Sequence, residues 1–481
     1  MKLINPLIIL RILSTILLIA TFSFIPCVPV AIIYKESFYP FLWSSLITFL
    51  GYILLRTITV KADMANMNLR DGFLAVTFSW IIFGAAGSLP YLFTGSVPSF
   101  TDAFFETVSG FTTTGATIMP DIELLPYSIL FWRSLTHWIG GLGIIVLVII
   151  ILPSLKITAQ QLFSLESSLK EKIHPKTTAI GYRLMFAYVG LTIIEVLLLY
   201  IGDMTLFDSI CHSFGTIATG GFSTRNASIT NYSAYSQYII TIFMFLAGVS
   251  FVIYYYIVKL QFGKVKRNEE LWFYTGTVAI AGITATAILF FQSGKALEPS
   301  FREGFFQVVS FITTTGFITT DYLYWPPAGI VLLFLLLFAG ASTGSSTGSI
   351  KMARHLITAK SIRNTFRKLL HQNIFTQVKL NGKPITEKTN NTVLSFIVLY
   401  LFIFITGTII TMISGLDIET AASAVASSLG NVGPGLGKIG PMFNYSELSE
   451  FNKIFFSLLM ITGRLEVVTV FALFSKTFWR I

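Results

Sequence analysis

The sequence predicts an all-α polytopic membrane protein in which four repeats of span, pore helix and span surround a pseudo-fourfold pore, preceded by an N-terminal two-helix hairpin. Three observations carry this prediction. The 481-residue chain is 54% hydrophobic and only 12% charged, with a mean hydropathy of +0.74, whereas soluble proteins carry about 25% charged residues. It holds about ten apolar segments, and crossing a bilayer takes about 20 residues. Between these segments, four shorter stretches repeat one pattern.

The apolar runs place the expected spans and units. The N-terminal run is too long for a signal peptide and lacks a small-residue cleavage site, so we expect it to stay as the first helix. The spans are expected at residues 7–33, 38–60, 72–95, 127–153, 181–202, 234–260, 271–293, 327–358, 392–414 and 451–479. The corresponding units are the hairpin at 1–70 and the pore repeats at 71–178, 179–268, 269–390 and 391–481.

The basic excess indicates how the chain is oriented. The formal net charge is +10. Of the 33 Lys and Arg, 25 fall on one side of the expected spans, six on the other and two within them. This asymmetry marks the cytoplasmic side of a membrane protein. Nine of the cytoplasmic cations lie between Lys351 and Lys388. The charge therefore reports topology and argues against nucleic acid as a partner.

Four short stretches align without gaps. They are DAFFETVSGFTTTG from Asp102, DSICHSFGTIATGG from Asp208, EGFFQVVSFITTTG from Glu303 and TAASAVASSLGNVG from Thr420. Thirteen positions separate the first residue from the final glycine in each stretch. The stretches are too short to cross a bilayer, so we expect re-entrant helices that enter from outside. Asp102, Asp208 and Glu303 are expected at the helix starts, where the helix dipole favours an acid.

The turn after each short helix is the candidate ion site. Irregular backbone at membrane depth is tolerated only where protein buries it or where it lines a water-filled cavity. Four equivalent turns around one axis would present rings of carbonyl oxygens, which replace the hydration shell of K⁺. Four unrelated loops with threonine caps are the alternative, which the shared register disfavours. The candidate filter residues are Thr112, Thr113, Thr114, Gly115, Ala218, Thr219, Gly220, Gly221, Thr313, Thr314, Thr315, Gly316, Gly430, Asn431, Val432 and Gly433.

Eleven small residues, Ala339 to Ser349, interrupt the eighth expected span. Their glycines, Gly340, Gly344 and Gly348, recur every fourth residue. A phosphate-binding loop is excluded, because Lys351 does not follow the last glycine directly and an oily helix precedes the run. A close helix-packing face is the alternative. The twelve preceding residues, 327–338, cover about 18 Å of helix in a membrane core of about 30 Å. We therefore interpret the small run as an intramembrane gate beneath the pore.

Arg464 lies in the middle of the last expected span. A charge at membrane depth is costly and usually marks a pathway or an ion pair. We interpret Arg464 as part of the gate, a positive barrier that faces the pore below the filter. A structural ion pair with Glu466 or Glu195 is the alternative.

The remaining reactive residues predict no active site. Arg133 and His137 lie beside Trp132 and Trp138, and such tryptophans are typical of the membrane interface, so we interpret the two cations as anchors. The cysteines, Cys27 and Cys211, predict neither a disulfide nor a metal site. Without a nucleophile–base pair, the sequence predicts no enzyme. It also predicts no cofactor bound by this chain beyond K⁺ ions in the filter.

These features resemble the Trk/Ktr/HKT superfamily of potassium transport subunits, in its TrkH/TrkG branch. The resemblance covers the whole chain: the hairpin that Ktr members lack, the four filter repeats, the loop at 165–175, the glycine-rich break and Arg464. It implies a homodimer in the bacterial inner membrane, a K⁺ filter, a gating loop and a cytosolic TrkA-type nucleotide-binding regulator. In plant HKT members a serine can replace the first filter glycine and favours sodium; Gly115 is intact here. The fourth repeat, with GNVG, departs most from the pattern.

The sequence thus predicts the K⁺-selective conducting subunit of a bacterial Trk K⁺ uptake system. The alternative is a K⁺ symporter driven by H⁺ or Na⁺, with Glu195 as the candidate coupling acid. We expect the cytosolic partner to dock on the basic segment Lys351–Lys388 and on the polar segment Glu166–Lys176.

Overall fold

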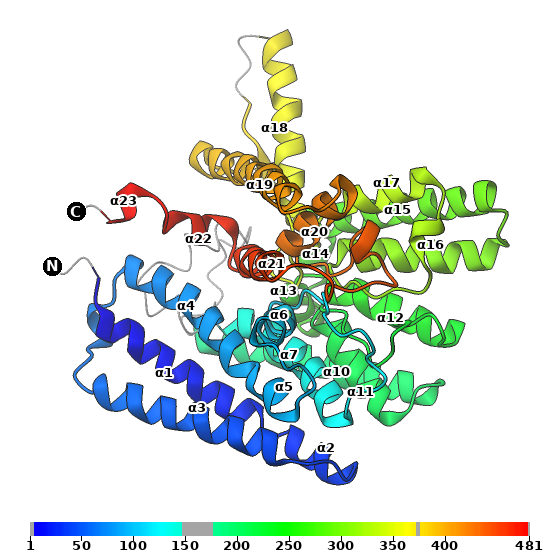
Figure 1. Cartoon of the computed structure of the whole chain (residues 1–481). Coiled ribbons are helices and arrows are strands. Elements are labelled where there is room, and N and C mark those ends of the chain that lie inside the picture. Colours follow the sequence, from blue (N-terminus) through cyan, green and yellow to red (C-terminus); the bar gives the residue numbers. More distant parts are fainter. Residues whose placement is uncertain (1–3, 147–176, 372–375, 480–481) are drawn as a thin grey trace.

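The computed structural model describes residues 4–146, 177–371 and 376–479, and its regular structure is almost entirely helical (Figure 1). The N-terminal hairpin consists of α1 (Pro6–Ser23), α2 (Cys27–Ile33) and α3 (Tyr39–Ile58). Repeat 1 holds α4 (Leu69–Gly87), α5 (Leu89–Thr94), α6 (Phe100–Phe111) and α7 (Tyr127–Val146). Repeat 2 holds α10 (Thr177–Ile201), α11 (Leu206–Ile217), α12 (Ala234–Ala247), α13 (Phe251–Val258) and α14 (Phe262–Lys266).

The second half of the chain follows the same plan. Repeat 3 holds α15 (Glu269–Ser293), α16 (Leu297–Ile312), α17 (Pro327–Leu336) and α18 (Met352–Leu370). Repeat 4 holds α19 (Glu387–Ile413), α20 (Ile418–Gly430), α21 (Glu450–Arg464), α22 (Val467–Ala472) and α23 (Lys476–Trp479). Short 3-10 turns occur at Met64–Asn66, Tyr322–Tyr324 and Gly437–Ile439. Between α18 and α19, β1 (Lys379–Leu380) and β2 (Lys383–Pro384) form a small antiparallel pair.

Within the described residues, six helices are long and apolar enough to cross a membrane. They are Pro6–Ile33, Tyr39–Ile58, Arg70–Thr94, Leu184–Ile201, Glu269–Ser293 and Glu387–Ile413. A seventh candidate is the pair α12 and α13, which is bent by 93° after Gly248. Two more expected spans are interrupted: α17 stops after ten residues, and α21 ends at Arg464 before α22 begins. The span expected at 127–153 runs beyond the described residues.

The N-terminal hairpin packs against the first repeat through polar contacts at its cytoplasmic end. Helix α1 packs on α3 and α4. Asn68 and Asp71 form a reciprocal capping box at the start of α4, and the Asp71 carboxylate also accepts a 2.7 Å hydrogen bond from the Asn5 backbone N–H. The outward faces of the hairpin are apolar and exposed, as at Trp43 and Leu54. This exposure suits a lipid-facing position.

The four short helices α6, α11, α16 and α20 are the expected pore helices. Three of them begin with a side-chain N-cap three residues before the aligned first position: Ser99, Thr205 and Asp417. The Thr420 N–H lies 3.0 Å from the Asp417 carboxylate, and this hydrogen bond lowers the pKa of that carboxyl. Asp102 and Asp208 stand in the first turn, as predicted.

The prediction for Glu303 is wrong. Helix α16 starts at Leu297, so Glu303 lies in its second turn and not at its start. The position that caps the other helices is Ser300 here, and its hydroxyl bonds back to the Ala296 carbonyl at 2.9 Å inside the longer helix. Glu303 instead forms an ion pair of 2.6 Å with Lys295.

Three pore helices pack against a helix of their own repeat and one of the neighbouring repeat, whereas α20 packs against α19 and α21 of repeat 4. Helix α6 packs against α7 of its own repeat and α21 of repeat 4; α11 packs against α12 and α7; α16 packs against α17 and α12. In Figure 1, α6 and α20 lie near the middle of the view, α11 and α16 lie toward the right, and α1 and α3 lie at the opposite edge. This cyclic packing brings the four expected filter turns together.

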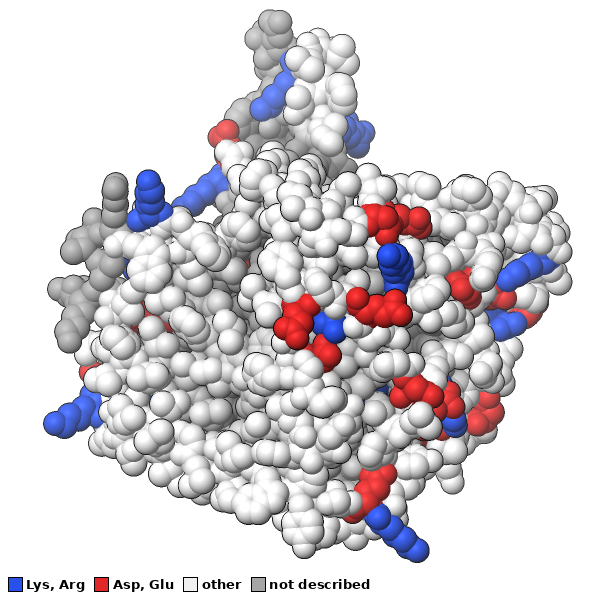
Figure 2. Space-filling view, viewed as in Figure 1, with Lys and Arg blue, Asp and Glu red and all other residues white. Residues whose placement is uncertain are grey.

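Charge is distributed as the topology requires. Most of the face seen in Figure 2 is uncharged. Lys and Arg mark the protruding helix α18 and the side that holds both termini, whereas mixed acidic and basic residues lie on the opposite side. The basic side is the expected cytoplasmic side.

Candidate functional site

Each pore helix ends in the same backbone motif. The second residue of each expected filter segment has a left-handed backbone, with φ of 53° at Thr113, 56° at Thr219, 52° at Thr314 and 56° at Asn431. The next backbone N–H reaches back to a carbonyl five residues earlier, at distances between 2.8 and 3.0 Å in all four repeats. This pair of features is the Schellman motif. A left-handed backbone at threonine is a genuine outlier, and such strain concentrates at functional sites.

The glycine that ends each segment completes a closed ring. Gly115, Gly221, Gly316 and Gly433 all have positive φ, between 79° and 104°. A Cβ added at Gly115 would lie 2.1 Å from the Gly220 oxygen, at Gly221 1.9 Å from the Thr315 oxygen, at Gly316 2.1 Å from the Val432 oxygen, and at Gly433 2.5 Å from the Thr114 oxygen. Each glycine therefore abuts the carbonyl that precedes the next glycine, and the fourth returns to the first. We call this arrangement the glycine ring.

The side chains of the segments hold their backbones in place. Thr112 and Thr114 share a hydrogen bond of 2.7 Å, and Thr313 and Thr315 share one of 2.8 Å. The segments of repeats 1 and 3 are thus alike in sequence and conformation. In repeat 4, the Asn431 amide instead donates to the Thr114 hydroxyl at 3.0 Å and to the Met460 carbonyl at 2.9 Å. The divergent fourth segment therefore joins the ring and is linked by its side chain to the first.

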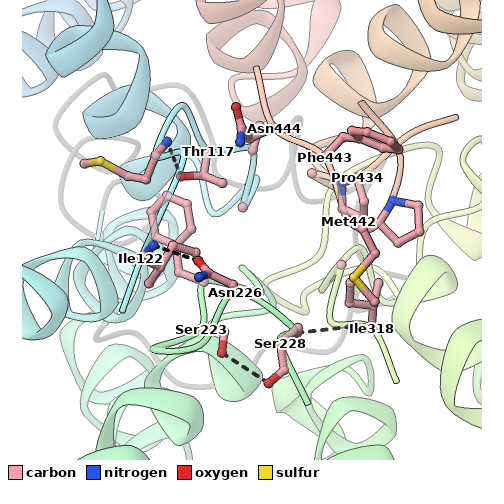
Figure 3. Close-up of a pocket in the computed structure, with 18 of the residues that line it drawn as sticks. Thr117, Ile122, Ser223, Asn226, Ser228, Ile318, Pro434, Met442, Phe443 and Asn444 are labelled. Atoms are coloured by element: carbon pink, nitrogen blue, oxygen red, sulfur yellow. Dashed lines mark hydrogen bonds between the residues drawn. The ribbon is translucent and has the colours of Figure 1, made fainter. Parts of the chain in front are cut away.

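A cavity of about 110 Å³ lies directly outside the glycine ring and is lined by all four repeats (Figure 3). Its floor includes the four glycines, and its walls include Thr117, Ser223, Ile318, Pro434 and Phe443. Among the described residues, its lining holds two arginines, Arg133 and Arg225, and no carboxylate. A ring of acids at the mouth is therefore not what would draw cations to this site.

The small-residue run Ala339–Ser349 forms a buried loop between α17 and α18. Its ends are joined where Ala339 and Ile350 form a parallel bridge, with the Gly340 N–H 2.7 Å from the Ile350 oxygen. Gly344 has φ +79°, whereas Gly340 and Gly348 lack room for a side chain: a Cβ would lie 2.3 Å from the Gly348 oxygen and 2.2 Å from the Gly430 oxygen, respectively. The three glycines thus serve two different needs, a left-handed turn and close backbone approach.

The loop contacts the inner residues of three filter segments. The Gly348 N–H donates to the Thr314 hydroxyl at 2.9 Å. The Thr219 hydroxyl donates to the Ser346 hydroxyl at 3.2 Å. Gly348 itself packs on the Gly430 carbonyl. Because these partners precede the ring glycines, the loop lies on the inner side of the glycine ring.

Arg464, at the end of α21, holds the same loop. Its guanidinium donates to the Ser346 carbonyl at 2.5 Å and to the Gly140 carbonyl at 3.2 Å. The alternative ion pairs are wrong: Glu466 pairs with Arg354 at 2.7 Å, and Glu195 is not bonded to Arg464. Arg464 therefore joins repeat 4, repeat 1 and the loop of repeat 3 at one point, directly inside the glycine ring.

Glu270 and Lys351 hold the middle of the loop at Thr343 and Thr347. One Glu270 carboxylate oxygen accepts from the Thr343 N–H at 2.5 Å and from the Ala353 N–H at 3.2 Å. The Lys351 ammonium donates to the Thr347 carbonyl and, at 3.0 Å, to its hydroxyl. Charged side chains from three elements thus fix a backbone that has little regular structure of its own.

Comparisons with known proteins decide the family. The model of the TrkH family, described as a cation transport protein, matches residues 49–480. The chain belongs to the TrkH family. It is 36% identical to the Trk system potassium uptake protein TrkH of Escherichia coli K12 over 428 residues, which cover 87% of this chain and 88% of that protein. It is 32% identical to Halomonas elongata TrkH over 486 residues, covering 98% and 99%.

Two further relatives agree. The Trk system potassium uptake protein TrkG of Escherichia coli K12 is 32% identical over 471 residues, covering 95% of both chains. The crystal structure of the potassium transporter TrkH from Vibrio parahaemolyticus superposes with a TM-score of 0.88 at 30% identity, covering 99% of this chain and 100% of that one. This chain is therefore a membrane subunit of the Trk potassium uptake system family and a multi-pass inner-membrane protein. Its family is one of transport proteins rather than of enzymes.

The interpretation of Arg133 and His137 as interfacial anchors is wrong for this TrkH-family member. Both side chains are buried behind the glycine ring. The His137 ring contacts the Gly110 carbonyl at 2.7 Å and stacks on Phe222 with 4.1 Å between ring centroids. Arg133 pairs with the buried Glu106 at 2.8 Å. Two signals in the sequence pointed to this cluster: a charge inside an expected span and a polar residue, Glu106, in an oily pore helix.

Some predicted features of the TrkH-like pattern cannot be placed. The loop at 165–175 and the polar segment 166–176 lie outside the described residues. The basic segment that begins at Lys351 is described up to His371 and again from Thr376, and it forms α18, β1 and β2.

Proposed function

We propose that this chain is the K⁺-selective conducting subunit of a bacterial Trk K⁺ uptake system. The observation that carries the proposal is the glycine ring, in which four segments of equal conformation bring their backbones together at one axis. Stacked carbonyls can replace the water around K⁺, and the C-terminal ends of four pore helices direct negative dipole ends toward the same place. The outer lining holds no carboxylate among the described residues, so the attraction for a cation is left to the backbone carbonyls and the helix ends.

The loop Ala339–Ser349 is the proposed gate. It rests against the inner side of the ring in repeats 2, 3 and 4 and is held by Arg464. It continues directly into α18, which projects from the body of the molecule (Figure 1). A pull on α18 would act on the loop through Lys351 and Glu270. Conduction would begin when the loop leaves the axis.

The proposed assembly is a homodimer that carries a cytosolic TrkA-type nucleotide-binding regulator. Helix α18 exposes a line of apolar side chains at Ile362, Phe366 and Leu369, next to the exposed cations Arg363 and Arg367. An apolar line on a basic, projecting helix suits contact with another protein chain better than contact with water. Reversing the charges at Arg363, Arg367 and Lys368 should weaken co-purification of the regulator while K⁺ selectivity stays unchanged. Undiminished co-purification would contradict docking at α18.

A K⁺ symporter driven by H⁺ or Na⁺ is the second candidate. Glu195 supports it, because this carboxylate of α10 is fully buried and has no ion-pair partner within the described residues. An acid of this kind inside a membrane span is a natural site for a coupled proton. A selective channel has no use for such a group.

Reversal potentials separate the two candidates. The purified protein is reconstituted in vesicles, and the potential at zero current is measured under K⁺ gradients with superimposed H⁺ or Na⁺ gradients. The proposed channel reverses at the K⁺ equilibrium potential whatever the H⁺ gradient, and Glu195→Gln leaves that potential unchanged. A reversal potential that moves with the H⁺ or Na⁺ gradient, and that Glu195→Gln returns to the K⁺ value, would establish symport instead.

A further inference from the structure

The side chain of Arg133 joins segments from two repeats just behind the glycine ring. Its Nε lies 2.8 Å from the Glu106 carboxylate on the first pore helix. One terminal nitrogen donates to the Ser223 carbonyl at 3.1 Å, and the other donates to the Thr117 hydroxyl at 3.1 Å. Thr117 and Ser223 are the second residues after Gly115 and Gly221, respectively. One guanidinium thus spans the chain immediately outside the ring in repeats 1 and 2.

Glu106 completes the connection on the side of repeat 1. Its carboxylate accepts from the Thr117 hydroxyl at 3.0 Å, from the Ile118 backbone N–H at 2.9 Å and from Arg133. Both Glu106 and Arg133 are almost completely buried, with side chains 0% and 1% exposed. Burying two charges is expensive and stabilises little unless every charge is paired and hydrogen-bonded. Here the bonds go to the backbone and hydroxyl that follow the ring.

The equivalent position of the other pore helices is occupied differently. Glu106 aligns with His212, Gln307 and Ala424, four residues after the first position of each repeat. His212 contacts the Ser223 hydroxyl at 2.9 Å, and Gln307 reaches the Thr319 hydroxyl at 3.5 Å. In repeat 4, Ser423 bonds to Leu436 instead. The aligned side chain supports the outgoing chain in repeats 1 to 3, and the neighbouring Ser423 does so in repeat 4. Within the described residues, an ion pair takes part in this support in repeat 1 alone.

Phe222 ties the two repeats further. It follows Gly221, and its ring lies 4.2 Å from the Arg133 guanidinium carbon and stacks on His137. The first residue after the ring in repeat 2 is thereby sandwiched between two side chains of α7, which belongs to repeat 1. A change in the position of Arg133 would therefore move the chain that follows the ring in repeat 1 and the chain that follows it in repeat 2.

We propose that Glu106 and Arg133 are positioning residues that fix the spacing of the ring carbonyls between repeats 1 and 2 and thereby set the preference for K⁺ over Na⁺. The inference rests on the proposed K⁺ conduction and names two residues that act on the ring through the chain next to it. In the cavity-size account of selectivity, a carbonyl cage prefers K⁺ because its oxygens resist contraction around the smaller Na⁺. The buried guanidinium of Arg133 opposes that contraction, because it is bonded to the chain that follows the ring in both repeats.

The test measures the K⁺/Na⁺ permeability ratio from bi-ionic reversal potentials in reconstituted vesicles. Glu106→Gln keeps the side-chain shape and removes the charge. Arg133→Lys keeps the charge and removes the fork. Each should lower the ratio about tenfold, which corresponds to about 1.4 kcal/mol between the two ions. Thr117→Val, a milder change that removes the shared hydroxyl, should lower it in the same direction even if the charge variants are poorly folded.

Asp102→Asn is the matched control. Asp102 lies one turn before Glu106 on α6 and forms an ion pair of 2.6 Å with Lys453, and within the described part of the chain no hydrogen bond joins its side chain to the residues after the ring. The K⁺/Na⁺ permeability ratio of Asp102→Asn should remain that of the wild type. A wild-type ratio in Glu106→Gln, Arg133→Lys and Thr117→Val would overturn the inference, as would an equal fall in Asp102→Asn. A wild-type protein that does not distinguish K⁺ from Na⁺ would contradict the proposed function itself.

Discussion

The glycine ring and the loop Ala339–Ser349 are both irregular, glycine-containing backbone at membrane depth, but they are held in opposite ways. Each of the four ring segments is fixed by the Schellman end of its own pore helix and by a neighbouring segment. Among the described residues, repeats 2 and 4 have only short breaks at the corresponding place, between α12 and α13 and between α21 and α22. The loop depends on a short bridge at its base and on the side chains of Arg464, Glu270 and Lys351.

This difference indicates that the ring and the loop have different functions. Moving one ring segment would break contacts with two others, so the ring keeps one geometry. The loop can move after a few charge-assisted hydrogen bonds are released, and hydrogen bonds to charged groups are worth about 1.5–3 kcal/mol each. A fixed ring suits selection among ions, and a releasable loop suits opening and closing.

The largest effect is expected from a side chain in the ring. Gly221→Ser should lower the K⁺/Na⁺ permeability ratio about 100-fold, because strain of about 3 kcal/mol at such a site corresponds to two factors of ten. The added Cβ would meet the Thr315 oxygen at 1.9 Å. Gly294→Ser is the control, since Gly294 also has positive φ but open space around it. Equal K⁺/Na⁺ permeability ratios in the two variants would mean that the ring does not select between the ions.

Shortening the loop is expected to have the next largest effect. Deleting several residues between Gly340 and Gly348 should raise K⁺ flux without the regulator by about 30-fold, since closure then loses interactions worth about 2 kcal/mol. Isotope uptake into vesicles measures it. If the run is a helix-packing face, the same deletion yields poorly assembled protein with low flux. A well-folded deletion variant with wild-type flux would show that the loop does not close the pore.

Arg464→Ala should raise basal flux about tenfold, the equivalent of losing one hydrogen bond to a charged group. The change removes both a positive charge and the contact with the Ser346 carbonyl. Lys453→Ala is the control, because Lys453 is a buried cation on the same helix that pairs with Asp102 and lies away from the loop. Basal K⁺ flux is measured for both variants by uptake assays. If the flux of Arg464→Ala does not exceed that of the wild type, the arginine has no role in closing the pore.

A smaller effect is expected at Glu270, which holds the loop at Thr343. Glu270→Gln should raise basal flux about threefold, since an amide oxygen still accepts from backbone N–H groups but without the charge. Glu269→Gln is matched to it, because Glu269 bonds to Lys360 and Asn381 rather than to the loop. Identical basal K⁺ flux from the two variants, measured by the same uptake assay, would show that Glu270 does not hold the loop in place.

The sequence predicted the features that recur and missed those that depend on distant partners. The ring glycines were found because four segments share one register. Arg133 was misplaced because Glu106 lies 27 residues before it and Ser223 lies 90 residues after it, and no local pattern links them. The flanking tryptophans suggested the interface, although Trp132 is fully buried.

The breaks in the helices were also only partly predictable. The run 234–260 is predominantly apolar and was predicted as one span, yet the chain bends by 93° after Gly248. The available signal was a glycine followed closely by Ser250. Glu466 was considered a partner for Arg464 because it lies two residues away. Its left-handed backbone, with φ 62° at the end of α21, instead accompanies a pair with Arg354. Side-chain direction after a helix ends cannot be read from spacing.

The bi-ionic reversal potential of the loop-deleted protein tests the central claim most directly, because it asks whether selection and closure reside in different parts of the chain. The measurement uses vesicles with K⁺ on one side and Na⁺ on the other, without the regulator. The ring alone should select, so the deletion variant should conduct more than the wild type and still reverse near the K⁺ equilibrium potential. A large leak that reverses near zero would contradict the account, because the loop would then be part of what distinguishes K⁺ from Na⁺.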